Sequence, residues 1–340
     1  MIGDYDAVLL VSFGGPDGPD DVVPFLENVT RGRGVPRERL EQVGQHYSLF
    51  GGVSPINGLC RELVAALEDV LKREGPDLPV YWGNRNWRPM LEETIGRMAE
   101  DGVRRAVAVA TSAYSSYSAC RQYLDDIERA REVVGEAAPV IEKIPPFWNH
   151  PGFIETMADN ARAALGRLQG EGAERSTRLV FTAHSIPTAM AGTCDYEVEL
   201  REASALVAER AAPGLDWELV YQSRSGPPGV PWLEPDVCDH LRAIRTAGVE
   251  RAVLVPIGFV ADHMEVVYDL DIEARDVADE IGLAISRAPA AGSAPRFVSG
   301  LREALVAHME GREPAVLGTR RPSPDPCAPG CCAYTPRRAR

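Results

Sequence analysis

Long hydrophobic runs are lacking in this sequence of 340 residues. Its longest apolar runs, residues 7–13 and 252–260, have the length of strands, whereas a membrane-spanning helix needs roughly 20 such residues. The N-terminus also lacks the basic segment that precedes the apolar run of a signal peptide. We therefore expect no signal peptide, no transmembrane segment and a cytoplasmic location.

Positive charge is scarce: 36 lysines and arginines stand against 50 aspartates and glutamates, for a formal net charge of -14. Such a balance disfavours nucleic acid and anionic membranes as main partners. It leaves room for an anionic small molecule, because that ligand needs only a local cluster of arginines. The candidates are Arg31 and Arg33, Arg85 and Arg88, and Arg121.

A disulfide framework is lacking as well, because the seven cysteines are odd in number and scattered. Four stand alone, whereas Cys327, Cys331 and Cys332 crowd into six residues. Their C-x3-C-C spacing differs from a C-x2-C zinc knuckle. Three thiolates in a short loop nevertheless make a partial site for a soft metal or an iron–sulfur cluster. A fourth ligand would have to come from elsewhere in the chain.

Apolar strands alternate with amphipathic helical stretches, which predicts an α/β fold with parallel sheets. The strand runs are almost wholly apolar, as expected for strands buried on both faces. Residues 102–109 (GVRRAVAV) resemble residues 248–255 (GVERAVLV), which indicates that the two halves repeat one architecture. The predicted strands cover residues 7–12, 80–83, 105–110, 140–144, 179–183, 218–222, 251–256 and 283–287. The predicted helices cover residues 58–74, 90–101, 119–134, 152–168, 196–211, 235–246, 263–281 and 296–308.

We therefore predict two similar Rossmann-like lobes, residues 1–150 and 151–310, each a parallel sheet flanked by helices, with a ligand cleft between them. The remaining tail, residues 311–340, is rich in Pro and Arg and could not form a packed core alone. We expect it to be either disordered or tied down by its cysteines. Ligands in such sheets bind beyond the carboxyl ends of the strands, so the residues that follow each strand are the candidates for chemistry.

His184 lies at the end of the strand in LVFTAHSIP (179–187) and should face the predicted cleft. Histidine is the side chain best suited to accept a proton near neutral pH. The alternative is a histidine that caps the following turn.

A row of carboxylates follows the strand at 251–256. Glu265, Asp269 and Glu273 repeat every four residues, which places them on one face of a helix. Like charges at that spacing repel, and a bound cation would remove the repulsion. Carboxylates together with a histidine suit Fe²⁺, Mn²⁺, Mg²⁺ or Zn²⁺. The alternative is a solvated acidic helix face.

Two glycine-rich segments, FGGPDG (13–18) and FGGVSPI (50–56), predict tight turns. Neither has the GxGxxG pattern or the Lys-Ser/Thr of a P-loop. Ser54 precedes Pro55 and can cap the following helix. Structural roles are therefore the default for both segments.

Taken together, the motifs resemble the ferrochelatase family. They occur in the order of that family from one end of the chain to the other. The resemblance implies two Rossmann-like lobes with a porphyrin between them, and the insertion of Fe²⁺ into that porphyrin. The matching segments are VSFGGP (11–16), FGGVSPI (50–56), SAYSSYS (112–118), TAHSIP (182–187) and GFVADHMEVVYDLDIE (258–273).

The resemblance implies roles for the residues of the candidate metal site. His184 matches the active-site histidine, and Glu265 matches a glutamate that faces it across the porphyrin. Asp269 and Glu273 match an acidic row proposed as a metal path. His184 would then accept the pyrrole protons and is also a candidate early ligand of the Fe²⁺ ion, and Glu265 would bind the ion or carry protons away.

Four further residues fall where members of the family contact the porphyrin. Phe13 lies where relatives place a residue against the ring or its metal, and some relatives carry Tyr there. Arg31, Ser54 and Tyr123 fall near positions that hold propionates in the enzymes that act on coproporphyrin. His46 stands where several of those enzymes carry arginine.

The resemblance also implies a [2Fe–2S] cluster, because some members hold one with one internal and three C-terminal cysteines. Cys120 would be the internal ligand and Cys327, Cys331 and Cys332 the others, in a structural or sensing role. The acidic chain, rich in Arg, Ala and Gly, resembles actinobacterial members, which generally make coprohaem.

We therefore expect a monomeric lyase that inserts Fe²⁺ into coproporphyrin III, with a downstream coprohaem decarboxylase as a partner. The alternatives are protoporphyrin IX as the substrate, a chelatase that inserts cobalt into an early tetrapyrrole, and a non-catalytic haem or metal carrier. Cobalt chelatases typically pair histidines at the metal site, whereas this sequence pairs His184 with Glu265.

Overall fold

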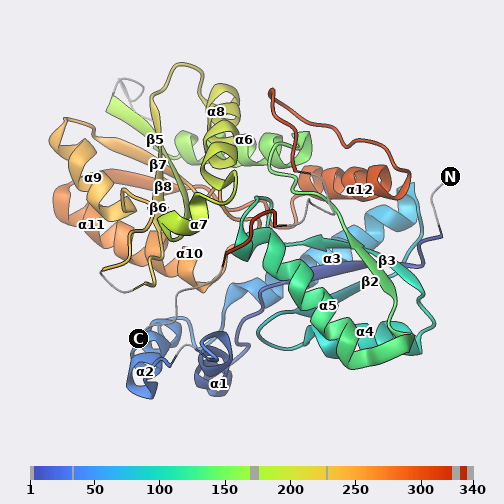
Figure 1. Ribbon diagram of the computed structural model, residues 1–340. Coiled ribbons are helices and arrows are strands. Elements are labelled where there is room, and N and C mark those ends of the chain that lie inside the picture. Colours follow the sequence, from blue (N-terminus) through green and yellow to red (C-terminus); the bar gives the residue numbers. More distant parts are fainter. Residues whose placement is uncertain (1–3, 33, 169–175, 227–228, 324–329, 335–340) are drawn as a thin grey trace.

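Two four-stranded parallel sheets form the centre of the computed structural model, which describes residues 4–32, 34–168, 176–226, 229–323 and 330–334 (Figure 1). The strand order is β2–β1–β3–β4 in the first sheet and β6–β5–β7–β8 in the second. This matching order confirms the predicted pair of similar Rossmann-like lobes. The strands are β1 (Ala7–Ser12), β2 (Val80–Asn84), β3 (Arg105–Ala110), β4 (Val140–Lys143), β5 (Thr177–His184), β6 (Trp217–Gln222), β7 (Arg251–Val255) and β8 (Ala284–Arg287).

The strands are apolar because helices cover both faces of each sheet. All six residues of β1 are buried, and Val8 lies opposite Val80 on one side and Val107 on the other. In the second sheet β5 has the same central place, with Leu179 opposite Trp217 and Val253. All eight predicted strands are present, and their ends differ from the prediction by at most two residues.

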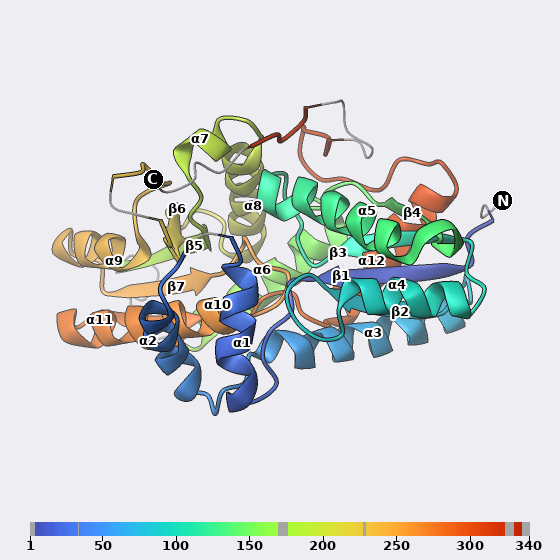
Figure 2. The same cartoon turned by 60° about the horizontal axis from the view of Figure 1, so that its bottom comes forward.

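Helices surround the sheets in both views (Figures 1 and 2). In the described part of the chain, none of them is both long and apolar enough to cross a membrane. The predicted helices correspond to α3 (Pro55–Glu74), α4 (Leu91–Glu100), η1 (Tyr117–Arg121) with α5 (Gln122–Val134), α6 (Pro151–Gly166), α8 (Tyr196–Ala211), α9 (Val237–Thr246), α10 (Met264–Tyr268) with η4 (Asp269–Glu273) and α11 (Ala274–Ile281), and α12 (Pro295–Met309).

Among the described residues, three α-helices were not predicted: α1 (Pro19–Val29), α2 (Arg37–Ser48) and the short α7 (Thr188–Ala191). Pro24 interrupts the helical signal of α1, and α2 is so polar that its apolar period is weak. Both helices are stabilised by tertiary packing, since they share a small core with Met264 of α10. Figure 2 shows α1 and α2 beside α10, so this pair belongs to the surroundings of the candidate site.

The two lobes share one continuous core. Its buried residues include Leu10 of the first sheet and Phe181 of the second. Helix α12 packs against both α3 and α6. Where α12 crosses α6, a Cβ atom on Gly152 would lie 2.8 Å from the Gly300 Cα, so this crossing requires glycine. The predicted division near residue 150 stays a prediction, because the core runs across it.

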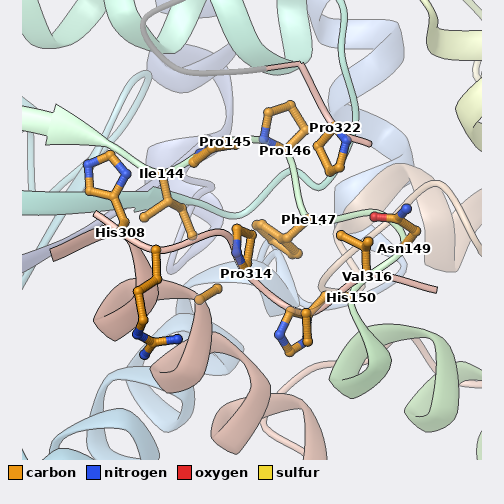
Figure 3. A pocket seen from close by; sticks show the side chains of 13 residues that line it. Ile144, Pro145, Pro146, Phe147, Asn149, His150, His308, Pro314, Val316 and Pro322 are labelled. Carbon is orange, nitrogen blue, oxygen red and sulfur yellow. The ribbon is translucent and has the colours of Figure 1, made fainter. Parts of the chain in front are cut away.

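The segment after α12 folds back onto the chain that joins the lobes. Asn149 Nδ2 donates hydrogen bonds to the carbonyl oxygens of Leu317 and Arg320 at 3.0 and 2.8 Å, and the Thr319 N–H donates to Glu202 at 3.0 Å. These hydrogen bonds, which involve no cysteine, hold residues 317–320 against the rest of the chain. A cavity of about 40 Å³ lies between this segment and residues 144–150, whose side chains Figure 3 shows. Of the predicted site residues that the structure describes, none lines it.

Candidate active site

His184 and Glu265 lie in direct contact in the second lobe. His184 is the last residue of β5, and Glu265 lies in the first turn of α10. The His184 Nε2 and Glu265 Oε2 atoms are 3.6 Å apart, and 32% and 53% of the two side chains are exposed. A porphyrin between two groups that touch its faces would need about 7 Å. In this structure the two side chains therefore leave no room for a ring between them. Their placement toward a porphyrin stays a prediction.

Each member of the pair favours the charged form of the other. Burial opposes the charge of Glu265, but the contact with His184 outweighs it and lowers the pKa of the carboxyl to about 2. Burial also opposes the charge of His184, but Glu265 outweighs it and raises the pKa of the imidazole. The Ser185 carbonyl oxygen lies within hydrogen-bond distance of His184 Nδ1, which leaves Nε2 directed at the glutamate. The arrangement suits an imidazole that takes up a proton beside an ionised carboxylate.

His263 completes this corner of the lobe, although its role was not predicted. It is the N-cap of α10, and its Nδ1 accepts hydrogen bonds from the backbone N–H groups of Glu265 and Val266 at 3.2 and 3.4 Å. Burial lowers the pKa of His263, which favours the neutral ring whose Nδ1 can accept these hydrogen bonds. His263 thereby stabilises the helix turn that carries Glu265. The sequence feature that could have indicated this role is a polar residue directly before an acidic first turn of a helix.

Asp269, the second carboxylate of the row, is half-buried rather than solvated. It lies in the π-helical segment η4, and the Ser223 hydroxyl donates a hydrogen bond to it. Gln222 Nε2 lies 3.4 Å from the same carboxylate oxygen. Burial and the charges of Glu265 and Glu273 raise the pKa of Asp269 to about 7. A solvated helix face does not produce such a shift, so the acidic row has features of a functional site.

Glu273 lies at the outer end of the row and is exposed. Burial of its inner part and the nearby charge of Asp236 raise its pKa. Among the described residues, no three His, Cys, Asp or Glu side chains are close enough together to hold one metal ion. The row is therefore a succession of single carboxylates that leads away from His184.

Helix α2 of the first lobe contacts α10, the helix that carries Glu265. The rings of His46 and Tyr268 stack with centroids 3.9 Å apart and planes 6° from parallel. Tyr47 is buried beside them, and its pKa is raised by burial and by the charge of Glu265. Sequence reasoning assigned no role to Tyr47 or Tyr268, because no local pattern signals a contact between lobes.

The sequence profile of the family described as Ferrochelatase matches residues 5–309. The chain belongs to the ferrochelatase family. A protein named Ferrochelatase from Rhodopirellula baltica is 53% identical over 337 residues, covering 98% of this chain and 95% of that protein. A protein named Coproporphyrin III ferrochelatase from Nocardia farcinica is 51% identical, covering 98% of each chain. One with the same name from Streptomyces coelicolor is 50% identical, covering 98% of this chain and 95% of its own length.

Solved structures show the same fold at low identity. SirB from Bacillus subtilis with Fe³⁺ has a TM-score of 0.54 at 12% identity, with 90% of this chain and 97% of SirB covered. DR2241 from Deinococcus radiodurans, described as structurally similar to chelatases, has a TM-score of 0.52 at 17% identity, with coverage of 91% and 56%. These likenesses support the chelatase-like fold alone.

Two of the predicted propionate contacts of this ferrochelatase-family chain have buried side chains. Ser54 is 3% exposed and lies against Gly15, where a Cβ atom would be 2.6 Å from the Ser54 Cβ. It occupies the N-cap position of α3, but its side chain makes no capping hydrogen bond. Tyr123 is 4% exposed and lies under the Arg85 guanidinium, 3.9 Å from the ring centroid. Their roles toward a propionate stay predictions.

The other two predicted porphyrin contacts are exposed. Phe13 follows β1, is 36% exposed and packs its ring edge-on against Phe25 at 6.3 Å. Arg31 lies exposed in the turn after α1. Arg85, a candidate for binding anions, is instead buried in an ion pair with Asp126. Arg31 is thus more accessible to a carboxylate ligand than Arg85. Arg33, another of the arginines proposed from the sequence, lies outside the described residues.

The cysteine tail reaches the first lobe. Cys332 is buried, and its Sγ lies 3.7 Å from that of Cys331. Burial and the neighbouring thiols of Cys331, Cys194 and Cys120 raise the pKa of Cys332. Cys120 itself is buried in η1, beside the contact of the Tyr117 and Tyr334 rings at 6.1 Å. Cys327 lies outside the described residues.

Proposed function

We propose that the protein inserts Fe²⁺ into coproporphyrin III, releasing two pyrrole protons and yielding coprohaem for haem biosynthesis. The observation that carries the proposal is the contact of His184 with Glu265 at 3.6 Å, with the acidic row leading away from it. Relatives at about half identity over nearly the whole chain, named Coproporphyrin III ferrochelatase, support the substrate. Iron is a substrate here rather than a resident metal.

The chemistry needs a proton acceptor and a route for a divalent ion. His184 is proposed to accept the pyrrole protons, because Glu265 stabilises its charged form. Glu265 is proposed to bind the incoming ion or to pass protons outward. Asp269 and Glu273 would bind the ion before it reaches the pair, one carboxylate at a time.

The porphyrin is proposed to lie between the lobes, against Phe13. Coproporphyrin III carries four propionates, so its rim needs cationic or hydrogen-bonding partners. Arg31 is proposed to bind one propionate directly. Ser54 and Tyr123 would contribute only if their buried side chains become accessible when the ligand binds. The sequence alone did not indicate that such a rearrangement is needed.

An anaerobic assay with Fe²⁺ and each of coproporphyrin III and protoporphyrin IX tests the proposal. We expect a higher kcat/KM for coproporphyrin III. The reverse order would favour the protoporphyrin alternative, which the relative named only Ferrochelatase leaves open. Stable haem binding without turnover would instead favour a carrier. Arg31→Gln, compared with the exposed Arg88→Gln, should raise the KM for coproporphyrin III more than that for protoporphyrin IX.

A [2Fe–2S] cluster is proposed at Cys120, Cys327, Cys331 and Cys332. Two thiolates bound about 2.3 Å from one tetrahedral metal lie about 3.8 Å apart, and the 3.7 Å between the sulfurs of Cys331 and Cys332 fits that geometry. When bound, the cluster would supply a cross-link and a one-electron redox centre. Metal insertion involves no net redox change, so we propose a structural or sensing role. We further propose that the protein is a cytoplasmic monomer whose product passes to a coprohaem decarboxylase.

A further inference from the structure

A buried carboxylate outside the His184–Glu265 pair joins the two lobes. Glu199 lies on α8 of the second lobe and is 3% exposed. Its Oε2 accepts a hydrogen bond of 2.6 Å from the backbone N–H of Ser115, and its Oε1 accepts a second from the Ser115 hydroxyl. Ser115 belongs to the loop that follows β3 in the first lobe. Burying a carboxylate is energetically unfavourable unless its oxygens accept hydrogen bonds. Here both oxygens of Glu199 accept hydrogen bonds from Ser115, a single residue of the other lobe.

The loop held by this carboxylate touches the supports of both members of the catalytic pair. The Tyr114 hydroxyl donates a hydrogen bond of 2.9 Å to the carbonyl oxygen of Ile257, in the segment that leads from β7 to α10 and Glu265. The Tyr114 ring also packs edge-on against Tyr196 at 6.1 Å. Tyr196 in turn donates from its hydroxyl to the carbonyl oxygen of His184 at 3.1 Å. Tyr114 thus contacts both supports at once.

These two supports are closely packed against each other. The Gly258 N–H donates to the carbonyl oxygen of Thr182 at 3.1 Å. A Cβ atom on Gly258 would lie 2.6 Å from the Ala183 Cβ, so no free space separates the strand end from the segment before α10. Because such packing transmits small shifts rather than absorbing them, the position of the loop bears on both His184 and Glu265.

We propose that Glu199 is a positioning residue for metal insertion: by holding Ser115 it fixes Tyr114 against Ile257 and Tyr196, and so sets the geometry of the catalytic pair. The inference rests on the proposed function, since it concerns the pair that would perform the reaction. Glu199 contacts neither His184 nor Glu265 itself. A displacement of reacting groups by about 1 Å can cost on the order of 10²-fold in rate, so a loosened loop should be visible in kcat.

Three variants test the proposal. Glu199→Leu removes both acceptors and leaves the buried Ser115 N–H without its partner. Glu199→Gln keeps the shape and can keep both hydrogen bonds, because its amide oxygen can accept from the N–H and its amide nitrogen can donate to the hydroxyl oxygen. Glu209→Gln is the matched control, since it removes one charge from an exposed position of the same helix.

We expect Glu199→Leu to lower kcat at least about tenfold while the KM for coproporphyrin III changes less than about twofold. Glu199→Gln should keep kcat within about threefold of the wild type, and Glu209→Gln should be indistinguishable from it. The second readout is Co²⁺ binding without porphyrin, followed by visible absorption, which reports ligand geometry. Glu199→Leu should weaken Co²⁺ binding at least about fivefold, and Glu199→Gln should not. A purely structural role would lower the thermal unfolding temperature but leave the Co²⁺ spectrum of the folded variant unchanged.

Should Glu199→Leu fail to fold, Ser115→Ala takes its place, because it removes only the hydroxyl contact; we then expect a loss in kcat of about threefold. The inference is overturned if the folded variant has wild-type kcat and Co²⁺ binding, or if Glu199→Gln loses as much as Glu199→Leu. Wild-type protein without chelatase activity would contradict the proposed function, whereas active wild type with unaffected variants would contradict only this inference.

Discussion

Asp269→Asn tests whether the acidic row handles iron. In the wild type, burial and the charges of Glu265 and Glu273 raise the pKa of Asp269 to about 7, although a hydrogen bond from Ser223 opposes the shift. The carboxyl therefore changes charge within the pH range in which the enzyme can be assayed. Asparagine keeps the shape and stays neutral throughout that range.

The size of the effect follows from the pKa. A carboxyl with a pKa of about 7 is about 9% ionised at pH 6 and about 91% ionised at pH 8, a tenfold change in its charged form. If the ionised form binds incoming Fe²⁺, the wild-type KM for iron should fall about tenfold between pH 6 and pH 8. The KM of Asp269→Asn should stay near the wild-type value at pH 6 over the whole range.

The assay is anaerobic steady-state insertion at saturating coproporphyrin III, with KM for Fe²⁺ measured at half-unit steps from pH 6 to pH 8. KM is the quantity compared because His184, whose pKa is also raised, will alter kcat in the same range. Asp279→Asn removes a charge from an exposed position on the following helix and is the control. A tenfold pH dependence of KM that persists in Asp269→Asn would refute the reasoning.

The pH dependence of the free energy of unfolding gives an independent check on the raised pKa of Asp269, because the direction of that dependence follows from the shift. The pKa of Asp269 is raised from 3.8 to about 7, so the folded state holds a proton in that range that the unfolded state has lost. The free energy of unfolding therefore decreases as pH rises from about 4 to 7, as far as this group is concerned. Asp269→Asn should lack that decrease when denaturant unfolding is measured across the same pH range.

Other changes address the remaining assignments. His184→Ala should lower turnover by about 10²–10⁴-fold while porphyrin binding, followed by fluorescence, is retained; turnover within a few-fold of the wild type would exclude its role as proton acceptor. Arg85→Leu should lower the free energy of unfolding, measured with denaturant, by about 3 kcal/mol, because the buried Asp126 carboxylate then keeps only Arg129 as an ion-pair partner among the described residues. The exposed Arg88→Leu should change it by no more than about 0.5 kcal/mol. Cys332→Ser should abolish the visible absorption of protein purified without oxygen and lower its thermal stability, while Cys60→Ser should keep both; a colourless wild type without iron and sulfide would end the cluster proposal.

The fold could be predicted where one local pattern decided the outcome. The strands are short apolar runs between turns, and burial on both faces demands that pattern, as in β1 and β5. His184 and Glu265 could be predicted for a related reason. His184 ends one strand of the second sheet and Glu265 follows another, and parallel strands bring their carboxyl ends to one edge. Their contact at 3.6 Å is the outcome of that topology.

The parts that could not be predicted depend on contacts between distant segments. Helices α1 and α2 have weak periodicity and are held by the core that they share with Met264. The stack of His46 on Tyr268 joins residues of two lobes, and neither residue stands out in its own segment. The tail was expected to be either disordered or tied down by its cysteines, yet the hydrogen bonds of Asn149 hold residues 317 and 320 in place.

Similarity to a family predicts where a residue lies in the chain more reliably than it predicts whether its side chain is exposed, as Tyr123 shows. Its place in the chain matches a residue expected at a propionate, but its ring is covered by the Arg85 guanidinium, which is itself held by Asp126. The sequence suggested that Arg85 could bind an anionic ligand, but its guanidinium instead pairs with the carboxylate of Asp126 inside the protein. A propionate could recruit Tyr123 only by displacing a buried ion pair, so Arg31 at the exposed turn after α1 is the side chain whose replacement should decide how the substrate rim is bound.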